Sequence, residues 1–203
     1  MQLGHYSTTK KGRPVWMSRA ETEKFIACGT SELSRQVMRL LSFGLRVSEV
    51  RNLNDGDLIN RDGCYWLIIR KSKTGYRENP ASSKVESYKF PLVSQRGTRL
   101  STRQMQRYVI QTGKVYAQQY PEDIDEESKT HKALYIRPHD FRRSAATQLL
   151  TGDGGEPLDP NHVKTFLGWK LDSTVFLNHY ITHAGIRSSP KITDERSKNS
   201  LFD

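Results

Sequence analysis

Residues 139–150 have the sequence HDFRRSAATQLL, which is typical of a strong helix. Pro138 precedes the stretch, and Gly152 follows it closely. Proline is favoured where a helix begins and glycine where it ends, so we expect a helix over 139–151. The apolar residues of this stretch would give the helix one face for a core.

The first turn of this predicted helix carries two side chains suited to an anion. His139 and Arg142 are three positions apart, which places them on one helical face, while Phe141 turns toward the core. The N-terminus of a helix itself favours an anion. The pattern therefore indicates a phosphate-type site. The alternative is a capping histidine followed by a surface arginine.

Other helices are predicted from capping signals and from apolar residues at helical spacing. Ser18 and Glu21 form a capping-box pattern, as do Ser101 and Gln104, and Asp159 precedes a first-turn proline. We expect helices over residues 18–28, 31–43, 47–53, 101–120, 160–167 and 172–183.

The predicted strands are few. Residues 64–69, CYWLII, are rich in the aromatic and β-branched types that strands favour. Residues 87–92, SYKFPL, are predicted as the partner strand, and the polar stretch 70–86 would then form a long connection. The fold class is therefore mainly α with a small antiparallel β-hairpin or sheet (α+β). The glycine-rich stretch 152–160 lacks the P-loop pattern and is predicted to be a plain connection.

Composition narrows the class of protein. The chain has 203 residues, enough for one compact domain or one domain with arms. Its net charge of +10 favours a polyanionic partner such as nucleic acid, although a merely basic soluble protein is the alternative. No apolar run is long enough to span a bilayer and no signal peptide is recognisable, so we expect a cytoplasmic protein without membrane association. Cys28 and Cys64 lack metal-ligand spacing and are expected to be reduced thiols.

The ends of the chain and one internal segment are polar. Residues 1–17 are predicted to be a basic N-terminal arm or linker, in which Lys10, Lys11 and Arg13 could contact a DNA backbone. A solvated tail is the alternative. Residues 185–203 are predicted to be a polar C-terminal tail. The acidic segment 121–132 has no regular ligand spacing, so a solvated loop is favoured over a metal site.

A second arginine is placed for phosphate binding. Arg46 lies in GLRVSE, where a helix is about to begin, and its planar guanidinium can bind two phosphate oxygens. Glu49 is close enough in sequence to orient it. The alternative is an ordinary surface ion pair between these two residues.

The remaining candidates are dispersed along the chain. Lys73 lies in SKTG after a predicted strand and could donate a proton to a leaving oxygen, or it is a solvated loop lysine. Lys71 and Lys84 are local competitors for this role. Trp169 in LGW offers an indole N–H donor, or it packs in the core. Tyr180 in NHYITH could act as a nucleophile near two arginines, or it is an amphipathic helix residue. His179 is expected to face DNA or solvent.

In this order the motifs resemble the catalytic domain of the tyrosine recombinases, the phage integrase family, over residues 18–184. GLRVSE is similar to that family's first arginine box, SKTG to its hairpin-lysine segment, HDFR to its H-x-x-R box, and NHYITH to its nucleophile segment. LGW resembles the LGH position of many members. Family members usually carry a further N-terminal helical domain, so the chain is expected to be either a fragment or a reduced member.

The resemblance implies a tyrosine recombinase catalytic-domain fold and a site-specific recombinase or integrase. Its catalytic residues would be Arg46, Lys73, His139, Arg142, Trp169 and the nucleophile Tyr180. Lys10, Lys11, Arg13, Lys71, Arg143 and His179 would contact DNA, and Glu49 would orient Arg46. The partner would be duplex DNA, bound by a homotetramer on paired sites, with a monomer possible without DNA. No metal or other cofactor is expected.

Three other functions are weighed against this one. A tyrosine-type DNA topoisomerase would use similar chemistry on one strand without a defined site. A non-catalytic DNA-binding module would keep the fold but not the reaction. A nuclease would use a metal held by the acidic segment.

Overall fold

The computed structural model describes residues 1–3, 13–72, 75–173 and 176. Within these residues the helices are α1 (Arg19–Ala27), α2 (Glu32–Ser42), α3 (Val47–Asn52), α4 (Thr102–Gln119), α5 (Pro138–Thr151) and α6 (Pro160–Leu167), and the 3-10 turns are Ser83–Val85 and Lys132–Tyr135. Each of the predicted helices up to residue 167 is present, with ends that differ from the prediction by at most one residue. The predicted helix over 172–183 lies almost wholly outside the described residues.

The capping signals act as the sequence predicts. Ser18 and Ser101 accept hydrogen bonds from the backbone N–H three residues later, and Glu21 and Gln104 return the bond to the capping residue. Gly152 ends α5 in the left-handed conformation. Local hydrogen bonding therefore defines these helix ends, as capping boxes generally do.

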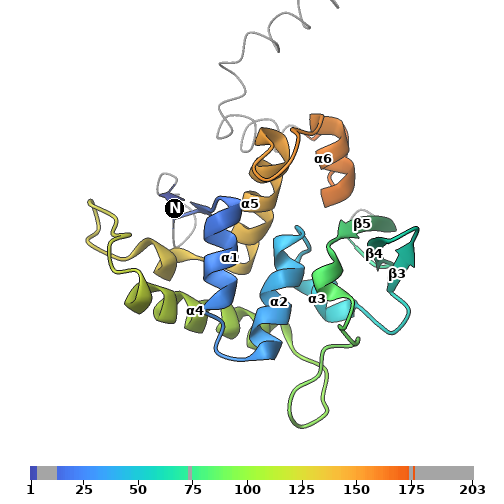
Figure 1. The fold of residues 1–203 in the computed structure, drawn as a ribbon, viewed down its shortest axis with the longest axis horizontal. Helices are drawn as coiled ribbons and strands as arrows, with labels where there is room; N and C mark the ends of the chain where they lie inside the picture. The colour runs from blue at the N-terminus through green and yellow to red at the C-terminus, as the bar shows by residue number, and fades with distance from the viewer. Residues whose placement is uncertain (4–12, 73–74, 174–175, 177–203) are drawn as a thin grey trace, which may run out of the picture.

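The helices form a bundle around one main apolar core. Figure 1 shows α1, α2 and α5 side by side, with α4 crossing their ends. Phe25, Leu41, Met105 and Phe141 come from four different helices and meet in this core, each almost completely buried. A second cluster joins the C-terminal half of α5 to α6 through Leu150, Val163 and Leu167, among others. The second cluster places the end of α6 against the bundle.

A three-stranded antiparallel sheet lies beside α3 and α6. Its order is β3 (Leu58–Arg61), β4 (Cys64–Ile69) and β5 (Arg77–Ala81), with Ile69 opposite Arg77 (Figure 1). The predicted strand 64–69 is confirmed as the central strand. Residues 70–76 join β4 to β5, and within them the Gly75 N–H donates to the Ser72 carbonyl over 3.2 Å and the Ser72 hydroxyl donates to the Gly75 carbonyl over 2.7 Å.

The prediction of a partner strand at residues 87–92 is wrong. Both edges of β4 are taken by β3 and β5, and residues 87–92 instead run over the core with Phe90 and Leu92 buried. The strand β5 was not predicted, because the residues on its buried face are the polar Arg77 and Asn79. Buried polar side chains give no apolar alternation, so the usual strand signal is missing.

The described residues before α1, 1–3 and 13–17, form part of the packed domain. β1 (Gln2–Leu3) pairs with β2 (Val15–Trp16), and Val15 is completely buried. The Val15 N–H donates to the buried Asp140 carboxylate over 3.3 Å, and the Met17 N–H donates to Ser144 over 2.9 Å. These bonds attach the segment before α1 to α5.

The acidic segment 121–132 is more ordered than the expected solvated loop. Ile124 and His131 form an isolated antiparallel bridge, and the Asp125 side chain is largely buried. Asp125 accepts hydrogen bonds from Ser128 and from Arg13. The segment therefore holds the N-terminal residues through a carboxylate.

None of the described helices has the length and apolar character needed to cross a membrane. The fold class predicted from the sequence, mainly α with a small antiparallel sheet, is confirmed.

Candidate active site at the end of helix α6

Arg46 occupies the N-cap of α3, where its backbone and side chain bind the same carboxylate. The Arg46 N–H donates to Glu49 Oε2 over 2.7 Å, and Nη1 donates to Glu49 Oε1 over 2.7 Å. Nη2 reaches the carbonyl of Gly168 over 3.3 Å. The capping interaction thus fixes the direction in which this guanidinium points.

Glu49 is buried between two arginines. Arg77, the first residue of β5, donates from Nη1 to Oε1 over 2.9 Å and from Nη2 to Oε2 over 2.8 Å. Burial by itself would raise the pKa of Glu49, but the hydrogen bonds and charges of Arg77 and Arg46 outweigh it and lower the pKa from 4.5 to about 2. Glu49 is therefore a carboxylate at neutral pH, as a group that orients arginines must be.

Arg142 is buried rather than exposed, with only 1% of its surface accessible. Its Nη1 donates to the carbonyl of Gly44 over 2.7 Å, and its Nη2 donates to the carbonyl of Leu167. Its guanidinium carbon lies 4.3 Å from the centre of the Trp169 ring. The alternative of an ordinary surface arginine is therefore wrong for this residue.

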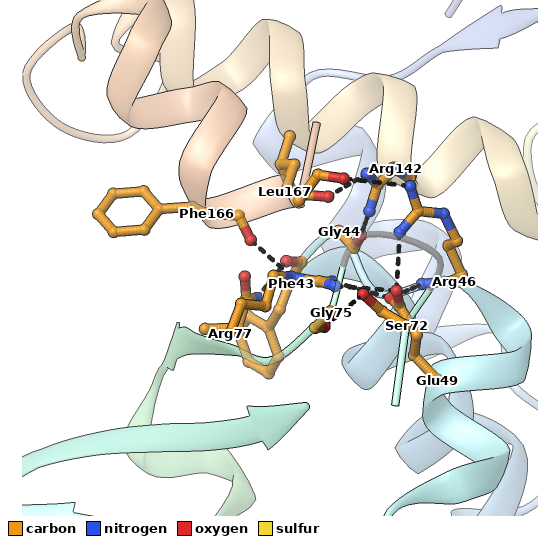
Figure 2. A network of polar contacts seen from close by, with 12 residues as sticks. Phe43, Gly44, Arg46, Glu49, Ser72, Gly75, Arg77, Arg142, Phe166 and Leu167 are labelled. Atoms are coloured by element: carbon orange, nitrogen blue, oxygen red, sulfur yellow. Dashed lines mark hydrogen bonds and ion pairs between the residues drawn. The ribbon is translucent and has the colours of Figure 1, made fainter. Parts of the chain in front are cut away.

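Arginines from three elements meet the last turn of α6. Within the described residues, Arg77 donates to the carbonyl of Phe166 over 3.1 Å, Arg142 to that of Leu167, and Arg46 to that of Gly168. Figure 2 shows how the guanidinium groups of Arg142, Arg46 and Arg77 gather around this turn and Glu49. The end of a helix carries partial negative charge and unpaired carbonyls, so it attracts cations.

Two glycines allow this close approach. Gly168 ends α6 with a φ of 63°, in the left-handed region that glycine adopts without strain. Gly44 has a φ of 82°, and a Cβ at this position would collide with the Leu167 side chain. The glycine in GLRVSE thus lets the loop before α3 pass against α6, which places its carbonyl within reach of Arg142.

His139 and Trp169 differ in exposure and in their contacts. His139 is exposed at the second residue of α5, one turn before Arg142. Trp169 is half-buried and packs on Phe176, with ring centres 5.1 Å apart. Trp169 therefore packs against Phe176 and also contacts the guanidinium of Arg142.

The other predicted residues are exposed, bind other carboxylates or lie outside the described residues. Lys71 is exposed in the loop after β4, and Arg143 binds the Asp140 carboxylate. The Arg13 guanidinium lies 2.8 Å from Asp125 and 3.0 Å from Glu127, so it binds the acidic segment. Five predicted residues fall outside the described residues: Lys10, Lys11, Lys73, His179 and Tyr180.

The sequence reasoning missed Arg77. The residue lies in a polar stretch that was predicted to be a long connection, and no motif marks it. The sequence feature that could have identified Arg77 is its position four residues after Lys73, where the second strand of a tight hairpin could begin. This position is informative only once the pairing of β4 with β5 is known.

The arrangement offers a set of hydrogen-bond donors for an oxyanion. Arg46 and Arg142 donate hydrogen bonds to backbone carbonyl oxygens. An anionic phosphate oxygen is a stronger acceptor than a neutral carbonyl, so a phosphate can replace these carbonyls as the acceptor. Among the described residues, no group of three His, Cys, Asp or Glu side chains is arranged to hold a metal ion.

Comparison with known proteins identifies the family of this chain. The model of the phage integrase family matches residues 17–185, and the chain belongs to this family. Sequence comparison with curated proteins finds no match.

Three solved structures illustrate the likeness in fold. The XerA recombinase superposes with a TM-score of 0.62 at 20% identity, over 91% of this chain and 65% of that one. The XerH recombinase in a post-cleavage complex with a palindromic difH substrate gives 0.60 at 20% identity, over 86% and 51%. A lambda integrase dimer bound to a COC′ core site gives 0.61 at 16% identity, over 86% and 50%. The fold is that of the tyrosine recombinase catalytic domain, and this chain spans half to two thirds of these proteins.

Proposed function

We propose that this chain is the catalytic part of a site-specific recombinase or integrase that cuts and rejoins duplex DNA through a 3′-phosphotyrosyl intermediate. The observation that carries the proposal is the convergence of Arg46 and Arg142, from motifs far apart in sequence, on the last turn of α6. Two fixed guanidinium groups suit the two non-bridging oxygens of one phosphodiester.

The proposed first step exchanges one phosphoester bond for another. The phenol oxygen of Tyr180 bonds to the scissile phosphorus, and the bond from phosphorus to the 5′ oxygen breaks. The phenol proton passes to His139, and Lys73 supplies a proton to the leaving 5′ oxygen. Strand joining reverses these events with the 5′-hydroxyl of the partner strand. No nucleotide or metal takes part, because the tyrosine ester keeps the energy of the broken bond.

The arginines would stabilise the charge that grows on the phosphate in the transition state. To do so, Arg46 and Arg142 would donate to phosphate oxygens in place of the carbonyl oxygens of Gly168 and Leu167. Glu49 would keep Arg46 oriented during this change of acceptor. A donor of this kind is worth about 3 kcal/mol in the barrier. Trp169, in contact with Arg142, adds its indole N–H and a flat surface for the guanidinium.

The proposed partner is duplex DNA, bound by a homotetramer on paired sites in the cytoplasm. The net charge of +10 supplies the attraction for the phosphate backbone. Lys10, Lys11, Lys71, Arg143 and His179 are proposed contacts to the DNA outside the scissile phosphate.

The direct test is a covalent-adduct assay on nicked duplexes that lose a short fragment after cleavage. A pool of phage or transposon end sequences supplies candidate sites, and denaturing gels detect protein linked to labelled DNA. We expect an adduct with the wild type and with Tyr108→Phe, a matched tyrosine change on α4, but none with Tyr180→Phe. The adduct should form in EDTA.

The other outcomes identify the rival functions. Relaxation of supercoiled DNA without any defined site indicates a topoisomerase. DNA binding without an adduct on any substrate indicates a binding module. Cleavage that EDTA abolishes indicates a metal nuclease. Each of these results contradicts the proposal.

A further inference from the structure

Arg77 is a buried arginine with three separate hydrogen bonds to protein. Only 8% of its surface is accessible, and its three bonds all go to protein groups. Two of its donors hold both oxygens of Glu49, and its Nε donates to the carbonyl of Phe166. A planar guanidinium makes these three bonds in fixed directions, which a lysine ammonium does not.

These bonds close a ring through the candidate site. Arg77 binds Glu49, Glu49 binds Arg46, Arg46 binds the carbonyl of Gly168, and the backbone returns from Gly168 to Phe166, which Arg77 holds (Figure 2). A closed ring restrains each member from two directions. Arg46 is therefore fixed both by its own cap and, through Glu49, by the sheet.

The position of Arg77 in the chain connects this ring to the hairpin. Arg77 is the first residue of β5 and directly follows the connection 70–76, in which the Gly75 N–H donates to the Ser72 carbonyl. Lys73 lies in the sequence of that connection. One side chain thus ties together the end of this connection, the N-cap of α3 and the end of α6.

We propose that Arg77 is a positioning residue of the recombination site: it sets the orientation of Arg46 through Glu49 and the position of the α6 terminus through Phe166. The inference rests on the proposed function for its effect on catalysis. Buried ion pairs are often replaceable without loss of stability, so stability alone gives this triad little reason to be charged. Geometry at a phosphate supplies that reason, because misplacement by about 1 Å can cost roughly 100-fold in rate.

The test is Arg77→Lys, which keeps the charge but loses the fork. Under saturating DNA, we expect the single-turnover rate of adduct formation to fall by about 10- to 100-fold while the Kd for the duplex stays nearly unchanged. Arg39→Lys is the matched control: Arg39 also makes a two-pronged pair, with Glu23, but this pair joins α1 to α2 instead of the α3 cap to α6. The control should retain the wild-type rate.

A double-mutant cycle separates positioning from general destabilisation. If Arg77 acts through Glu49, the rate losses of Arg77→Lys and Glu49→Gln should combine to much less than their product. Independent losses that multiply, or an Arg77→Lys rate equal to that of Arg39→Lys, overturn the proposal.

A readout that needs no activity keeps the two proposals distinguishable. The Arg46 Nε–H relaxation measured by NMR should show a rigid side chain in the wild type and in Arg39→Lys, and a mobile one in Arg77→Lys. A rigid Arg46 in Arg77→Lys refutes the positioning role. If the wild type forms no adduct, the proposed recombinase function is refuted. The NMR measurement does not need activity, so it still decides whether Arg77 positions Arg46.

Discussion

Glu49→Gln tests the electrostatics of the site through protein stability. The folded pKa of Glu49 is about 2, against an ordinary value of 4.5. A depressed pKa means that the folded state favours the charged carboxylate, so the stabilisation is present above about pH 5 and is lost as the pH falls toward 2. The difference in pKa corresponds to about 3 kcal/mol of unfolding free energy, of which about 2 kcal/mol is already lost at pH 3.

The assay is urea unfolding of the wild type and of Glu49→Gln at several pH values from 7 to 3. At pH 7 the variant should be less stable by about 3–5 kcal/mol, because Arg77 is left buried without its counter-charge. This difference should shrink by about 2 kcal/mol at pH 3, since the wild type loses its carboxylate there.

The control is Glu23→Gln, a carboxylate that pairs with Arg39 and Lys84 and is more exposed than Glu49. Hydrogen bonding to Arg39 lowers the pKa of Glu23, so its difference from the wild type should also narrow at low pH, but by less. A stability difference between the wild type and Glu49→Gln that stays constant from pH 7 to pH 3 would refute the proposed charge network.

Three further variants test separate parts of the account. Arg142→Lys should slow single-turnover cleavage by about 100-fold or more while DNA affinity, measured by fluorescence anisotropy, changes little; an equal loss of both would make Arg142 a general DNA contact. Gly44→Ala should lower the free energy of unfolding by about 2 kcal/mol, because an alanine is strained at a positive φ and its Cβ collides with Leu167; urea unfolding measures this, and an unchanged midpoint contradicts the packing. Arg13→Gln should lower the free energy of unfolding by about 1 kcal/mol and leave the salt dependence of DNA binding unchanged, because the acidic segment already binds this arginine. If the slope of log K against log salt concentration fell in magnitude by about one, Arg13 would be a DNA contact.

The sequence predicted the helices because their signals are local. Ser18, Ser101 and Gly152 each act through bonds to residues within four positions, and such bonds are visible in a short window of sequence. The strand β5 was missed for the opposite reason. Its inward residues, Arg77 and Asn79, are held by Glu49 and by the carbonyl of Phe43, both distant in sequence.

The candidate site shows the same division. The motifs identified Arg46, Glu49 and Arg142 as a group, and the structure brings them to one turn of α6. Their burial and their carbonyl partners depend on how α6 packs against α5 and β5, which no short motif encodes. The roles of Lys73 and Tyr180 stay predictions, since both lie outside the described residues.

The central claim is that Tyr180 forms the covalent bond to DNA, and peptide mapping of the adduct tests it most directly. Trypsin should release residues 171–187, a peptide whose single tyrosine is Tyr180. After nuclease digestion of the trapped adduct, we expect mass spectrometry to find the residual nucleotide on Tyr180. A nucleotide on a serine or threonine of that peptide, or on any other peptide, would contradict the account.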